Sequence, residues 1–353
     1  MQSVLLLRLS SLGDVLFALP VVERLRAAKP ELRITFLVED RFEEVPRALR
    51  AIDEVLVFPR RRGFGAVARH LSDLRRRRFD AVIDLQGNLK SALHLAALRR
   101  SHKIGFSAQA GREGNAYFLD EAVTPPAHAV HRVDRFLSLL SPLKIHTHRE
   151  RPIPLDVGGE RRAAADAWRE SLSADSVAVL HPGTSAFGAF KRWPPERFGE
   201  FASALAKERG VRSVVSGGPG EESLVEAAVA ASRGAAVAMT GVRSLLDLTA
   251  RMAAADLVVA GDTGPLHLAN RMGVPVVALF GPKDPNKYGP AFSPSAVIRR
   301  DDVPCSPCTR RWCEAPACMA ALRMEPVLEA AIAQIDAARA TKAGERRPRF
   351  KGC

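Results

Sequence analysis

The stretch Val258-Val-Ala-Gly-Asp-Thr-Gly-Pro-Leu-His-Leu-Ala-Asn270 contains the transition from strand to helix that decides the fold of this chain. The apolar run at 256–260 is typical of a buried parallel strand, and a helical pattern follows the turn. Thr263 or Asp262 can cap that helix, and Pro265 suits its first turn. A strand that leads into a helix in this way predicts one βα unit of a parallel sheet.

The turn in this stretch has the features of an anion site. Backbone N–H groups at the start of a helix bind anions, and Gly264 has no Cβ to keep a ligand away from the backbone. His267, on the first helical turn, can donate a hydrogen bond to a phosphate or sugar oxygen. We therefore predict a phosphate-bearing ligand here; a strand–turn–helix corner without a ligand is the alternative.

A second strand, glycine turn and helix open the chain. The run is Val4-Leu-Leu-Leu-Arg-Leu-Ser-Ser-Leu-Gly-Asp-Val-Leu-Phe-Ala-Leu-Pro20, and Asp14 stands where the helix begins, at the carboxyl end of the first strand. In open α/β sheets, ligands bind at that edge. Because a helix start lowers the pKa of a carboxylate, Asp14 is a candidate for a base that accepts a proton. A structural helix cap is the alternative.

Strand and helix patterns alternate along the chain, which predicts an α/β fold with parallel sheets. The expected strands are 4–9, 33–38, 54–58, 81–85 and 103–106 in the first half, and 176–180, 213–216, 235–239, 257–260 and 274–280 in the second. A length of 353 residues favours two domains, and prolines and charges break the pattern at 141–154. We place one domain at 1–150 and the other at 151–340. The basic tail 341–353 has no core pattern and is predicted to be disordered.

Basic residues outnumber acidic ones, 52 to 39, which gives a formal net charge of +13. This imbalance favours an anionic partner, such as nucleic acid, an anionic membrane surface or a phosphorylated substrate; an arginine-rich surface without such a partner is the alternative. No helix-turn-helix, zinc finger with histidine ligands or set of stacking aromatics is apparent, which disfavours a nucleic-acid binder. The turn Ser10-Ser-Leu-Gly-Asp-Val15 lacks the Gly-x-Gly-x-x-Gly of nicotinamide-dependent dehydrogenases.

The N-terminus does not have the pattern of a signal peptide. Arg8 and Asp14 interrupt its apolar run, and no small-residue cleavage site follows a basic head. No other window reaches the roughly eighteen uncharged residues of a membrane span. We expect a cytoplasmic protein.

Four cysteines lie close together, at Cys305, Cys308, Cys313 and Cys318. Their spacing, C-x2-C-x4-C-x4-C, is compatible with a structural zinc ion and, in principle, with an iron–sulfur cluster. A disulfide is disfavoured in a reducing cytosol. Reduced structural thiols are the alternative to a metal.

Four motifs in one order make this chain resemble glycosyltransferase family 9, the bacterial lipopolysaccharide heptosyltransferases. They are the Ser-Leu-Gly-Asp that ends at Asp14, His181-Pro-Gly-Thr-Ser185, Lys191-x-Trp-Pro194 and Asp262-Thr-Gly-Pro-x-His267, and the resemblance covers nearly the whole chain. It implies a GT-B architecture, in which two Rossmann-like domains face each other across a cleft. It also implies transfer of a heptose, with inversion, from ADP-heptose to the phosphorylated lipid A–Kdo inner core. A family 9 transferase for another nucleotide sugar or surface glycan is the alternative.

The resemblance places the nucleotide sugar in the second domain. Lys191 would act in catalysis, because its charge, together with the helix start at Thr263-Gly264, stabilises the diphosphate as it leaves. The other implied donor contacts are Thr184, Ser185, Glu222, Thr240, Gly241, Asp262, Pro265 and His267. Glu221 competes with Glu222 for the nucleotide ribose, and the sequence leaves both open.

The first domain would hold the base and the acceptor. The aspartate of the family motif is the catalytic base, which implies that role for Asp14. Basic residues near strand ends would meet the charges of the acceptor; they are Arg60, Arg61, Arg62, Arg112 and Arg132. Asp84 begins a segment that resembles a family segment at the cleft, or it fixes a loop.

The sequence has no Asp-x-Asp pair of the kind that holds a divalent ion under a nucleotide diphosphate. We therefore expect no cofactor in catalysis, with Lys191 and the helix dipole taking the place of the ion. We further expect a monomer that rests on the inner face of the cytoplasmic membrane and binds no nucleic acid.

Overall fold

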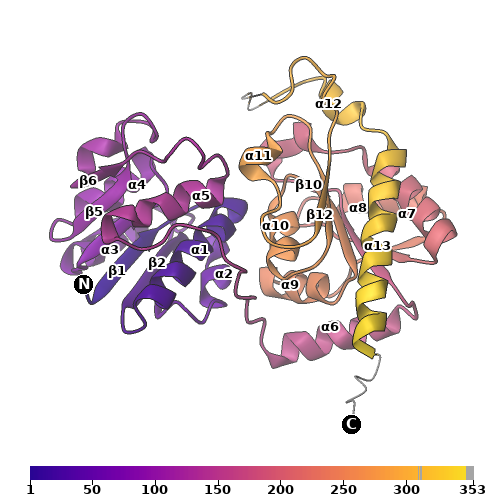
Figure 1. The fold of residues 1–353 in the computed structure, drawn as a ribbon, viewed down its shortest axis with the longest axis horizontal. Coiled ribbons are helices and arrows are strands. Elements are labelled where there is room, and N and C mark those ends of the chain that lie inside the picture. The colour runs from indigo at the N-terminus through magenta and orange to yellow at the C-terminus, as the bar shows by residue number, and fades with distance from the viewer. Residues whose placement is uncertain (309, 311, 347–353) are drawn as a thin grey trace, which may run out of the picture. The chain divides into compact units, whose positions relative to one another are not determined.

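A computed structural model of the chain describes residues 1–308, 310 and 312–346. The chain folds as two compact units, Met1–Asp156 and Val157–Cys353, and each unit is built around one six-stranded sheet flanked by helices (Figure 1). The division between them falls a few residues after the boundary that the sequence suggested at 150.

The sheet of the first unit is parallel throughout, in the order β3-β2-β1-β4-β5-β6. Its strands are β1 Ser3–Leu7, β2 Arg33–Glu39, β3 Glu54–Phe58, β4 Ala81–Asp84, β5 His102–Phe106 and β6 Glu121–Val123. The helices between them are α1 Leu12–Ala28, η1 Asp40–Phe42, α2 Glu44–Arg47, α3 Phe64–Arg76, α4 Leu89–Ala97, η2 Asn115–Phe118, α5 Arg132–Leu137 and η3 Ser138–Leu143. The central strand β1 reads Ser-Val-Leu-Leu-Leu because both faces of a parallel sheet are covered.

The second unit repeats this plan with the strand order β12-β11-β10-β7-β8-β9. Its strands are β7 Val177–His181, β8 Arg212–Val215, β9 Ala236–Ala238, β10 Leu257–Gly261, β11 Val276–Leu279 and β12 Ser295–Ile298. Its helices are α6 Gly159–Ser171, η4 Ala186–Lys191, α7 Pro195–Arg209, α8 Glu222–Ala231, α9 Leu245–Ala253, α10 Gly264–Arg271, α11 Pro285–Tyr288, α12 Ala317–Ala320 and α13 Met324–Arg346.

Both sheets therefore have the strand order 3-2-1-4-5-6 of doubly wound folds, which confirms the predicted α/β fold with two Rossmann-like halves. In this topology the chain reverses its direction across the sheet at one point. That point lies between β1 and β4 in the first unit and between β7 and β10 in the second. Ligands of such folds bind beyond the carboxyl ends of the strands at the reversal, so each unit presents one such place.

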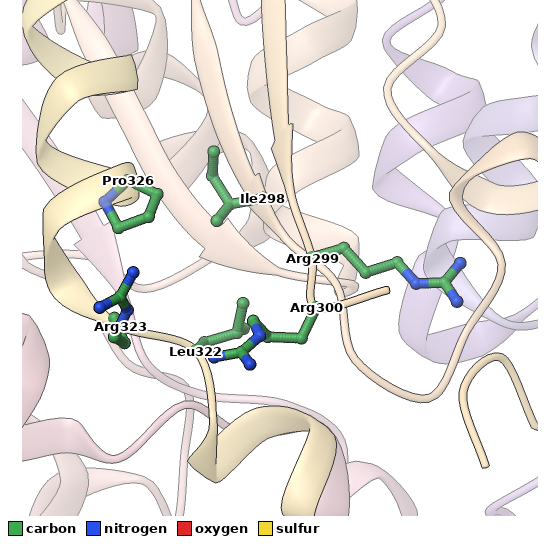
Figure 2. A pocket seen from close by; sticks show the side chains of 6 residues that line it. All are labelled: Ile298, Arg299, Arg300, Leu322, Arg323 and Pro326. Atoms are coloured by element: carbon green, nitrogen blue, oxygen red, sulfur yellow. The ribbon is translucent and has the colours of Figure 1, made fainter. Parts of the chain in front are cut away.

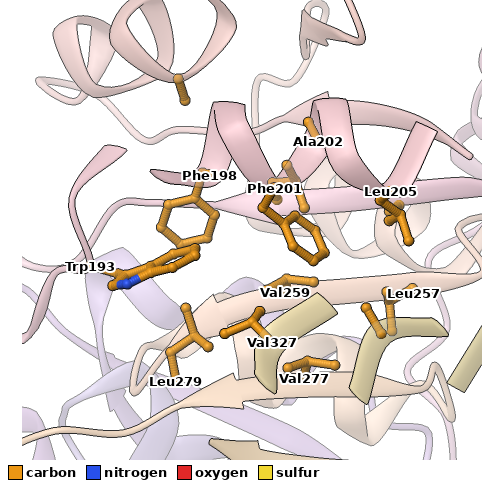
Figure 3. Packing of buried hydrophobic residues seen from close by; sticks show 14 of the residues in the cluster. Trp193, Phe198, Phe201, Ala202, Leu205, Leu257, Val259, Val277, Leu279 and Val327 are labelled. Carbon is orange, nitrogen blue, oxygen red and sulfur yellow. The ribbon is translucent and has the colours of Figure 1, made fainter. Parts of the chain in front are cut away.

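A large core fills one face of the second sheet, between α7, α13 and the strands (Figure 3). Trp193 is its largest member: it is buried, its ring meets the ring of Phe198 at 5.1 Å, and its Nε1 donates to the carbonyl of Leu322 at 3.0 Å. The Trp of the Lys191-Arg-Trp-Pro194 motif thus anchors this segment in the core, and Lys191 is held two residues before that anchor.

The structure differs from the sequence prediction at several elements. The short strands β6 and β12 and the helix α6 were not predicted. Helix α13 continues to Arg346, so the prediction of a disordered tail from 341 is wrong for its first residues. Residues 347–353 lie outside the described part. Among the described helices, none is both long and apolar enough to cross a membrane.

Candidate active site

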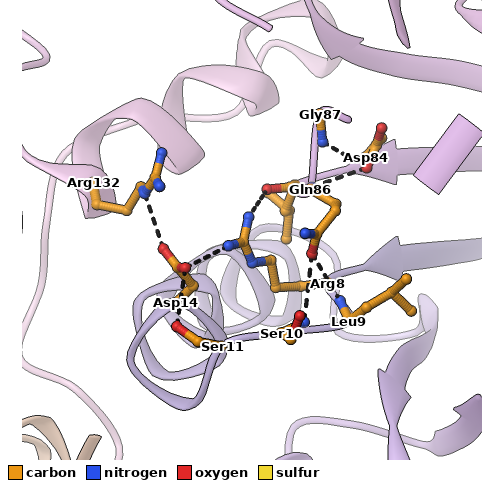
Figure 4. A network of polar contacts seen from close by, with 10 residues as sticks. Arg8, Leu9, Ser10, Ser11, Asp14, Asp84, Gln86, Gly87 and Arg132 are labelled. Atoms are coloured by element: carbon orange, nitrogen blue, oxygen red, sulfur yellow. Dashed lines mark hydrogen bonds and ion pairs between the residues drawn. The ribbon is translucent and has the colours of Figure 1, made fainter. Parts of the chain in front are cut away.

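Asp14 lies in the first turn of α1, at the carboxyl end of β1. Its Oδ2 is 2.6 Å from Nη2 of Arg8, and its Oδ1 accepts from Nε of Arg132 at 3.0 Å (Figure 4). The hydroxyl of Ser11 also donates to Oδ2, at 3.3 Å. The N-cap residue of α1 is Ser11, so the alternative that Asp14 caps the helix is wrong. The carboxylate is instead held between two guanidinium groups.

Two arginines decide the charge state of Asp14. Burial by itself would raise the pKa of the carboxyl, but the charges of Arg8 and Arg132 outweigh burial and lower the pKa to about 2. The Arg8 side chain is only 5% exposed, and its Nη1 donates to the carbonyl of Leu85 at 2.7 Å, which ties Asp14 to the end of β4. Asp14 is therefore an ionised, oriented hydrogen-bond acceptor at neutral pH.

The loop after β4 forms the other side of this centre (Figure 4). Gln86 accepts from the backbone N–H groups of Leu9 and Ser10 through Oε1, at 3.1 and 3.5 Å. Asp84 is fully buried and accepts four hydrogen bonds, from the N–H groups of Gln86 and Gly87 and from the side chains of Ser91 and Asn115. Burial raises the pKa of Asp84 to about 6. These contacts match the alternative that Asp84 fixes a loop.

The five arginines predicted to bind the acceptor have different surroundings. Arg132 contacts Asp14 itself. Arg60 forms an ion pair with the buried Glu39, with 2.9 Å between Nη1 and Oε1, while Arg61 and Arg62 are exposed beside it in the loop after β3. Arg112 is tied through its backbone N–H to the carbonyl of Gly87, at 3.0 Å. Arg132 is thus part of the Asp14 centre, and Arg60 is already paired.

In the second unit, Lys191 and Asp262 meet at the start of α10. The Lys191 Nζ is 2.6 Å from Oδ2 of Asp262, and Nε2 of His267 is 3.8 Å from Oδ1. Burial would raise the pKa of Asp262, but the hydrogen bond from His267 and the charge of Lys191 outweigh it, and the pKa is lowered. Thr263 is the N-cap residue of α10, as predicted, although its side chain makes no cap hydrogen bond. The Asp262 carboxylate points to Lys191 and His267.

A second polar cluster follows β7 and β8. Arg192 donates to Oγ1 of Thr184 at 3.0 Å and lies 3.9 Å from Oε1 of Glu221. The other Glu221 oxygen accepts from the N–H of Gly218 at 2.8 Å and is 3.9 Å from Nε2 of His181. This cluster brings predicted and unpredicted residues together, because Arg192 had no role assigned from the sequence.

Gly183 is the reason that Glu221 can lie there. A Cβ on Gly183 would fall 2.0 Å from Oε2 of Glu221, which is far inside van der Waals contact. Glu222, the glutamate placed in the predicted site, is exposed, and its Oε1 accepts from the N–H of Gly220 at 3.1 Å. Of the two glutamates that the sequence left open, Glu221 is the one within the cluster.

The remaining predicted donor residues lie at the same edge of this sheet. Ser185 is exposed, and its carbonyl accepts from Gly188 at 2.7 Å. Thr240 and Gly241 follow β9, where Gly241 has φ +74°, a conformation that favours glycine. Pro265 stands at the start of α10. All of them follow the carboxyl ends of parallel strands, where ligands of this topology bind.

Comparison with known proteins identifies the family of this chain. The sequence model of glycosyltransferase family 9 (heptosyltransferase) matches residues 67–318. Lipopolysaccharide heptosyltransferase 1 of Pseudomonas aeruginosa is 31% identical over 322 residues, which are 88% of this chain and 87% of that protein. The chain belongs to glycosyltransferase family 9.

Two solved structures have a similar fold. One is the ADP-heptose lps heptosyltransferase II of E. coli, with a TM-score of 0.76 and 21% identity over 96% of this chain and 99% of that one. The other is the E. coli heptosyltransferase WaaC with ADP-2-deoxy-2-fluoro heptose, with a TM-score of 0.67 and 26% identity over 84% and 93% of the two chains. This family 9 protein is therefore a glycosyltransferase with the fold of heptosyltransferases.

The four clustered cysteines of this family 9 enzyme are free thiols; Cys305 is exposed and Cys318 is buried. Burial, together with Cys305 and Cys308, raises the pKa of Cys318. Within the described residues, no three His, Cys, Asp or Glu side chains are arranged to hold a metal ion, so the structure gives the predicted zinc site no support.

A cavity of about 390 Å³ lies apart from these residues, at the carboxyl end of β12 (Figure 2). It is lined by Ile298, Arg299, Arg300, Leu322, Arg323 and Pro326. The side chain of Arg299 extends away from the other two arginines, and Arg300 is paired with Asp302 (Figure 2). None of the predicted site residues lines this cavity.

Proposed function

We propose that this enzyme transfers a heptose from ADP-heptose to the phosphorylated inner core of lipopolysaccharide, with inversion at the anomeric carbon. The observation that carries the proposal is the Lys191 ammonium held beside the start of α10, in a chain whose relatives are heptosyltransferases. A similar structure contains ADP-2-deoxy-2-fluoro heptose, which supports ADP-heptose as the donor class.

The donor diphosphate would lie between Lys191 and the N-terminus of α10. Both supply positive charge, and the first N–H groups of the helix are directed at the ligand. The diphosphate can bind Lys191 while the ion pair between Lys191 and Asp262 stays in place. An ammonium group has three donors, so one can stay on Asp262 at 2.6 Å while the other two point to phosphate oxygens. Asp262 would thus orient Lys191, and His267 would orient Asp262 or meet the sugar.

The nucleoside would lie beyond β7, β8 and β9. In this proposal Glu221 replaces Glu222 as the ribose contact, because its carboxylate lies among Thr184, Arg192 and His181. A carboxylate accepts hydrogen bonds from the two hydroxyl groups of a ribose. Ser185 adds a hydroxyl near the phosphates, and the Thr240–Gly241 loop would border the base.

The acceptor hydroxyl would be hydrogen-bonded to Asp14. Its oxygen forms a bond to the anomeric carbon on the face opposite ADP, while the bond from that carbon to the phosphate oxygen breaks. The hydroxyl proton passes to Asp14, and the electron pair of the broken bond leaves with ADP, where Lys191 stabilises the added charge. Arg132, Arg112 and the Arg60–Arg62 loop would hold the phosphates of the acceptor.

Turnover of a panel of nucleotide sugars tests this proposal. ADP-heptose is compared with UDP and GDP sugars, with a heptose-free inner core as acceptor and EDTA in the buffer, since Lys191 and α10 would serve in place of a metal ion. We expect turnover with ADP-heptose and a product of inverted anomeric configuration. Preference for a UDP or GDP donor would make the protein a family 9 transferase of another specificity.

A matched pair of variants tests the role of Lys191. Lys191→Met keeps the length of the side chain and removes its charge, so kcat should fall by about a hundredfold or more if Lys191 stabilises the leaving group. Lys207→Met, on the solvent side of α7, should leave kcat unchanged. Equal activity of the Lys191→Met variant and the wild type would exclude Lys191 from catalysis.

A further inference from the structure

The first unit exposes five large apolar side chains on neighbouring elements. Phe64 is 95% exposed, Tyr117 93%, Leu93 60%, Leu89 57% and Phe118 41%. Phe64 begins α3, Leu89 and Leu93 lie on α4, and Tyr117 and Phe118 lie on η2. Single exposed apolar residues are ordinary on a protein surface, but a contiguous group of them marks an interaction site. We call these five residues the α4 patch.

Helices α3 and α4 pack side by side on one face of the sheet. The rings of His70 and His94 meet across the two helices with centroids 5.4 Å apart, and both rings contact Phe58 at the end of β3. Each helix follows the carboxyl end of a strand of one parallel sheet, so their first residues, Phe64 and Leu89, lie at the same end. Leu93 is one turn after Leu89 on the same side of α4.

The η2 segment lies against the start of α4. The N–H of Leu89 donates to Oε2 of Glu113 at 3.1 Å, and Nδ2 of Asn115 donates to the carbonyl of Asn88 at 3.4 Å. In the sheet, β5 and β6 follow β4 on the side opposite β3, so η2 flanks α4 on the side away from α3. The patch therefore crosses three adjacent elements, with α4 in the middle.

Positive charge lies beside the patch where α3 and α4 begin, whereas the arginines at 75–78 belong to the far end of α3. Arg61 and Arg62 precede Phe64, and Lys90 follows Leu89; all three are exposed, and in the described part of the chain their side chains form no ion pair. Two carboxylates next to these residues are already hydrogen-bonded: Glu113 accepts from the N–H of Leu89, and Asp40 accepts from the N–H of Arg61. The exposed apolar side chains of the α4 patch thus lie next to cations that form no ion pair in the described part of the chain.

We propose that the α4 patch is the surface by which this enzyme docks on a membrane that contains anionic lipids. The apolar side chains would enter the boundary between headgroups and acyl chains, and Lys90 would meet the lipid phosphates beside the Arg60–Arg62 loop, which holds the acceptor phosphates in the proposed function. An acidic protein partner fits less well, because Phe64 and Tyr117 are almost fully exposed and can insert into a bilayer. This inference deepens the proposed function, since an acceptor that carries lipid A is itself held in a membrane.

Vesicle flotation of the full chain tests the proposal. The wild type is compared with Phe64→Ser/Tyr117→Ser on vesicles of phosphatidylcholine with phosphatidylglycerol and on vesicles of phosphatidylcholine alone. The matched control is Ile153→Ser/Trp312→Ser, which removes two exposed apolar side chains elsewhere. We expect the wild type and the control to float with the anionic vesicles, less so at high salt, and the patch variant to bind at least about tenfold more weakly.

Three results would overturn the proposal. They are equal flotation of the patch variant and the wild type, no preference of the wild type for anionic vesicles, and a wild-type dimer in light scattering that the patch variant dissociates. Turnover of ADP-heptose on a deacylated, water-soluble acceptor separates this proposal from the proposed function. On this soluble acceptor the patch variant should turn over ADP-heptose as fast as the wild type. Slower turnover by the patch variant alone would assign the patch to the acceptor site. Absence of turnover in both proteins would refute the proposed function and leave the flotation result unaffected.

Discussion

At the scale of single residues, Asp14 combines a strong hydrogen-bond acceptor with a low proton affinity. A carboxyl with a pKa of about 2 is a weak base in the resting protein, and the bond to the anomeric carbon must be forming before the proton moves. The two arginines that contact Asp14 differ in their exposure to solvent. The Arg8 side chain is 5% exposed and fixed, whereas that of Arg132 is 26% exposed. An acceptor phosphate that draws Arg132 toward itself would raise the proton affinity of Asp14.

The Asp14→Asn variant should lose both activity and stability. General-base catalysis contributes about a hundredfold to ten-thousandfold, so we expect kcat to fall at least about a hundredfold. The amide cannot compensate the buried charge of Arg8, and a pKa lowered from 3.8 to about 2 corresponds to about 2 kcal/mol in the free energy of unfolding. Because the folded-state pKa is the lower one, this contribution is complete above pH 4 and disappears as the pH falls toward 2.

Turnover and urea unfolding of Asp14→Asn at neutral and acidic pH check this expectation. Ser11→Ala is the matched control, since it removes only the 3.3 Å hydrogen bond to the same carboxylate. Near-wild-type turnover of Asp14→Asn would mean that the base is another group. An unchanged free energy of unfolding at neutral pH would mean that the ion pairs with Arg8 and Arg132 add no net stability.

Asp84 should have the opposite pH dependence. Burial raises its pKa from 3.8 to about 6, so the unfolded chain releases this proton first, and the free energy of unfolding should fall as the pH rises from about 4 to about 6. The loss over that window is about 3 kcal/mol. In Asp84→Asn this dependence should vanish, because the amide does not titrate. The Nδ2 of Asn115 donates to Asp84 in the wild type, so in the variant the Asn115 amide would turn over to present its unpartnered Oδ1 as the acceptor. The same slope in both proteins, measured by denaturant unfolding across this range, would contradict the raised pKa.

At the scale of elements, the turn after β7 can pack against the start of α8 because Gly183 in that turn has no Cβ. In Gly183→Ala the methyl group would lie 2.0 Å from Oε2 of Glu221, so the carboxylate must leave the cluster with Arg192. If Glu221 binds the ribose, Gly183→Ala and Glu221→Gln should weaken ADP binding alike, by about tenfold or more, since a hydrogen bond to a charged group contributes about 1.5–3 kcal/mol.

Calorimetric titration with ADP measures that loss. Gly159→Ala is the control, because a Cβ at Gly159 meets nothing within 4 Å. A Gly183→Ala variant that binds ADP as tightly as the wild type would show that Glu221 is outside the nucleotide site.

The sequence predicts some elements and not others for identifiable reasons. The predicted strands were long apolar runs, such as β1 and β10, whereas β6 has three residues and β12 alternates exposed and half-buried positions at the edge of its sheet. Helix α6 was missed because it is rich in charged residues and alanine, and Ala165 is its one buried residue. Tail residues at the end of α13 looked disordered because they carry charge, yet the helix continues through them.

The candidate site likewise contains residues that the sequence could place and residues that it could not. Motif residues that follow strands, such as Asp14 and Asp262, could be placed at a sheet edge from the sequence. Arg8 could be recognised only as an interruption of an apolar run, and its contact with Asp14 depends on the path of the chain between them. Glu221 and Glu222 could not be separated, because the turn after β8 decides which carboxylate faces the site. Gly183 and Arg192 lie within motifs, but their roles follow from contacts with residues distant in the sequence.

At the scale of the whole molecule, each unit has its own sheet and core, so ligand binding should stabilise the two units differently. The residues proposed to bind the donor belong to Val157–Cys353, and those around Asp14 belong to Met1–Asp156. ADP at about a hundred times its Kd stabilises the unit that binds it by about 2.7 kcal/mol. For a unit of this size, each kcal/mol moves the melting temperature by about 2–4 °C.

Differential scanning calorimetry of the full chain, with and without ADP, should therefore show one transition that rises by about 5 °C or more and one that moves less. Lys191→Met should reduce the shift of the first transition, because it removes charge from the diphosphate site. Asp14→Asn should lower the second transition without reducing the ADP shift, because its ion pairs lie in the other unit. An ADP shift that Asp14→Asn abolishes and Lys191→Met preserves would place the nucleotide in the first unit and reverse the proposed assignment of donor and acceptor.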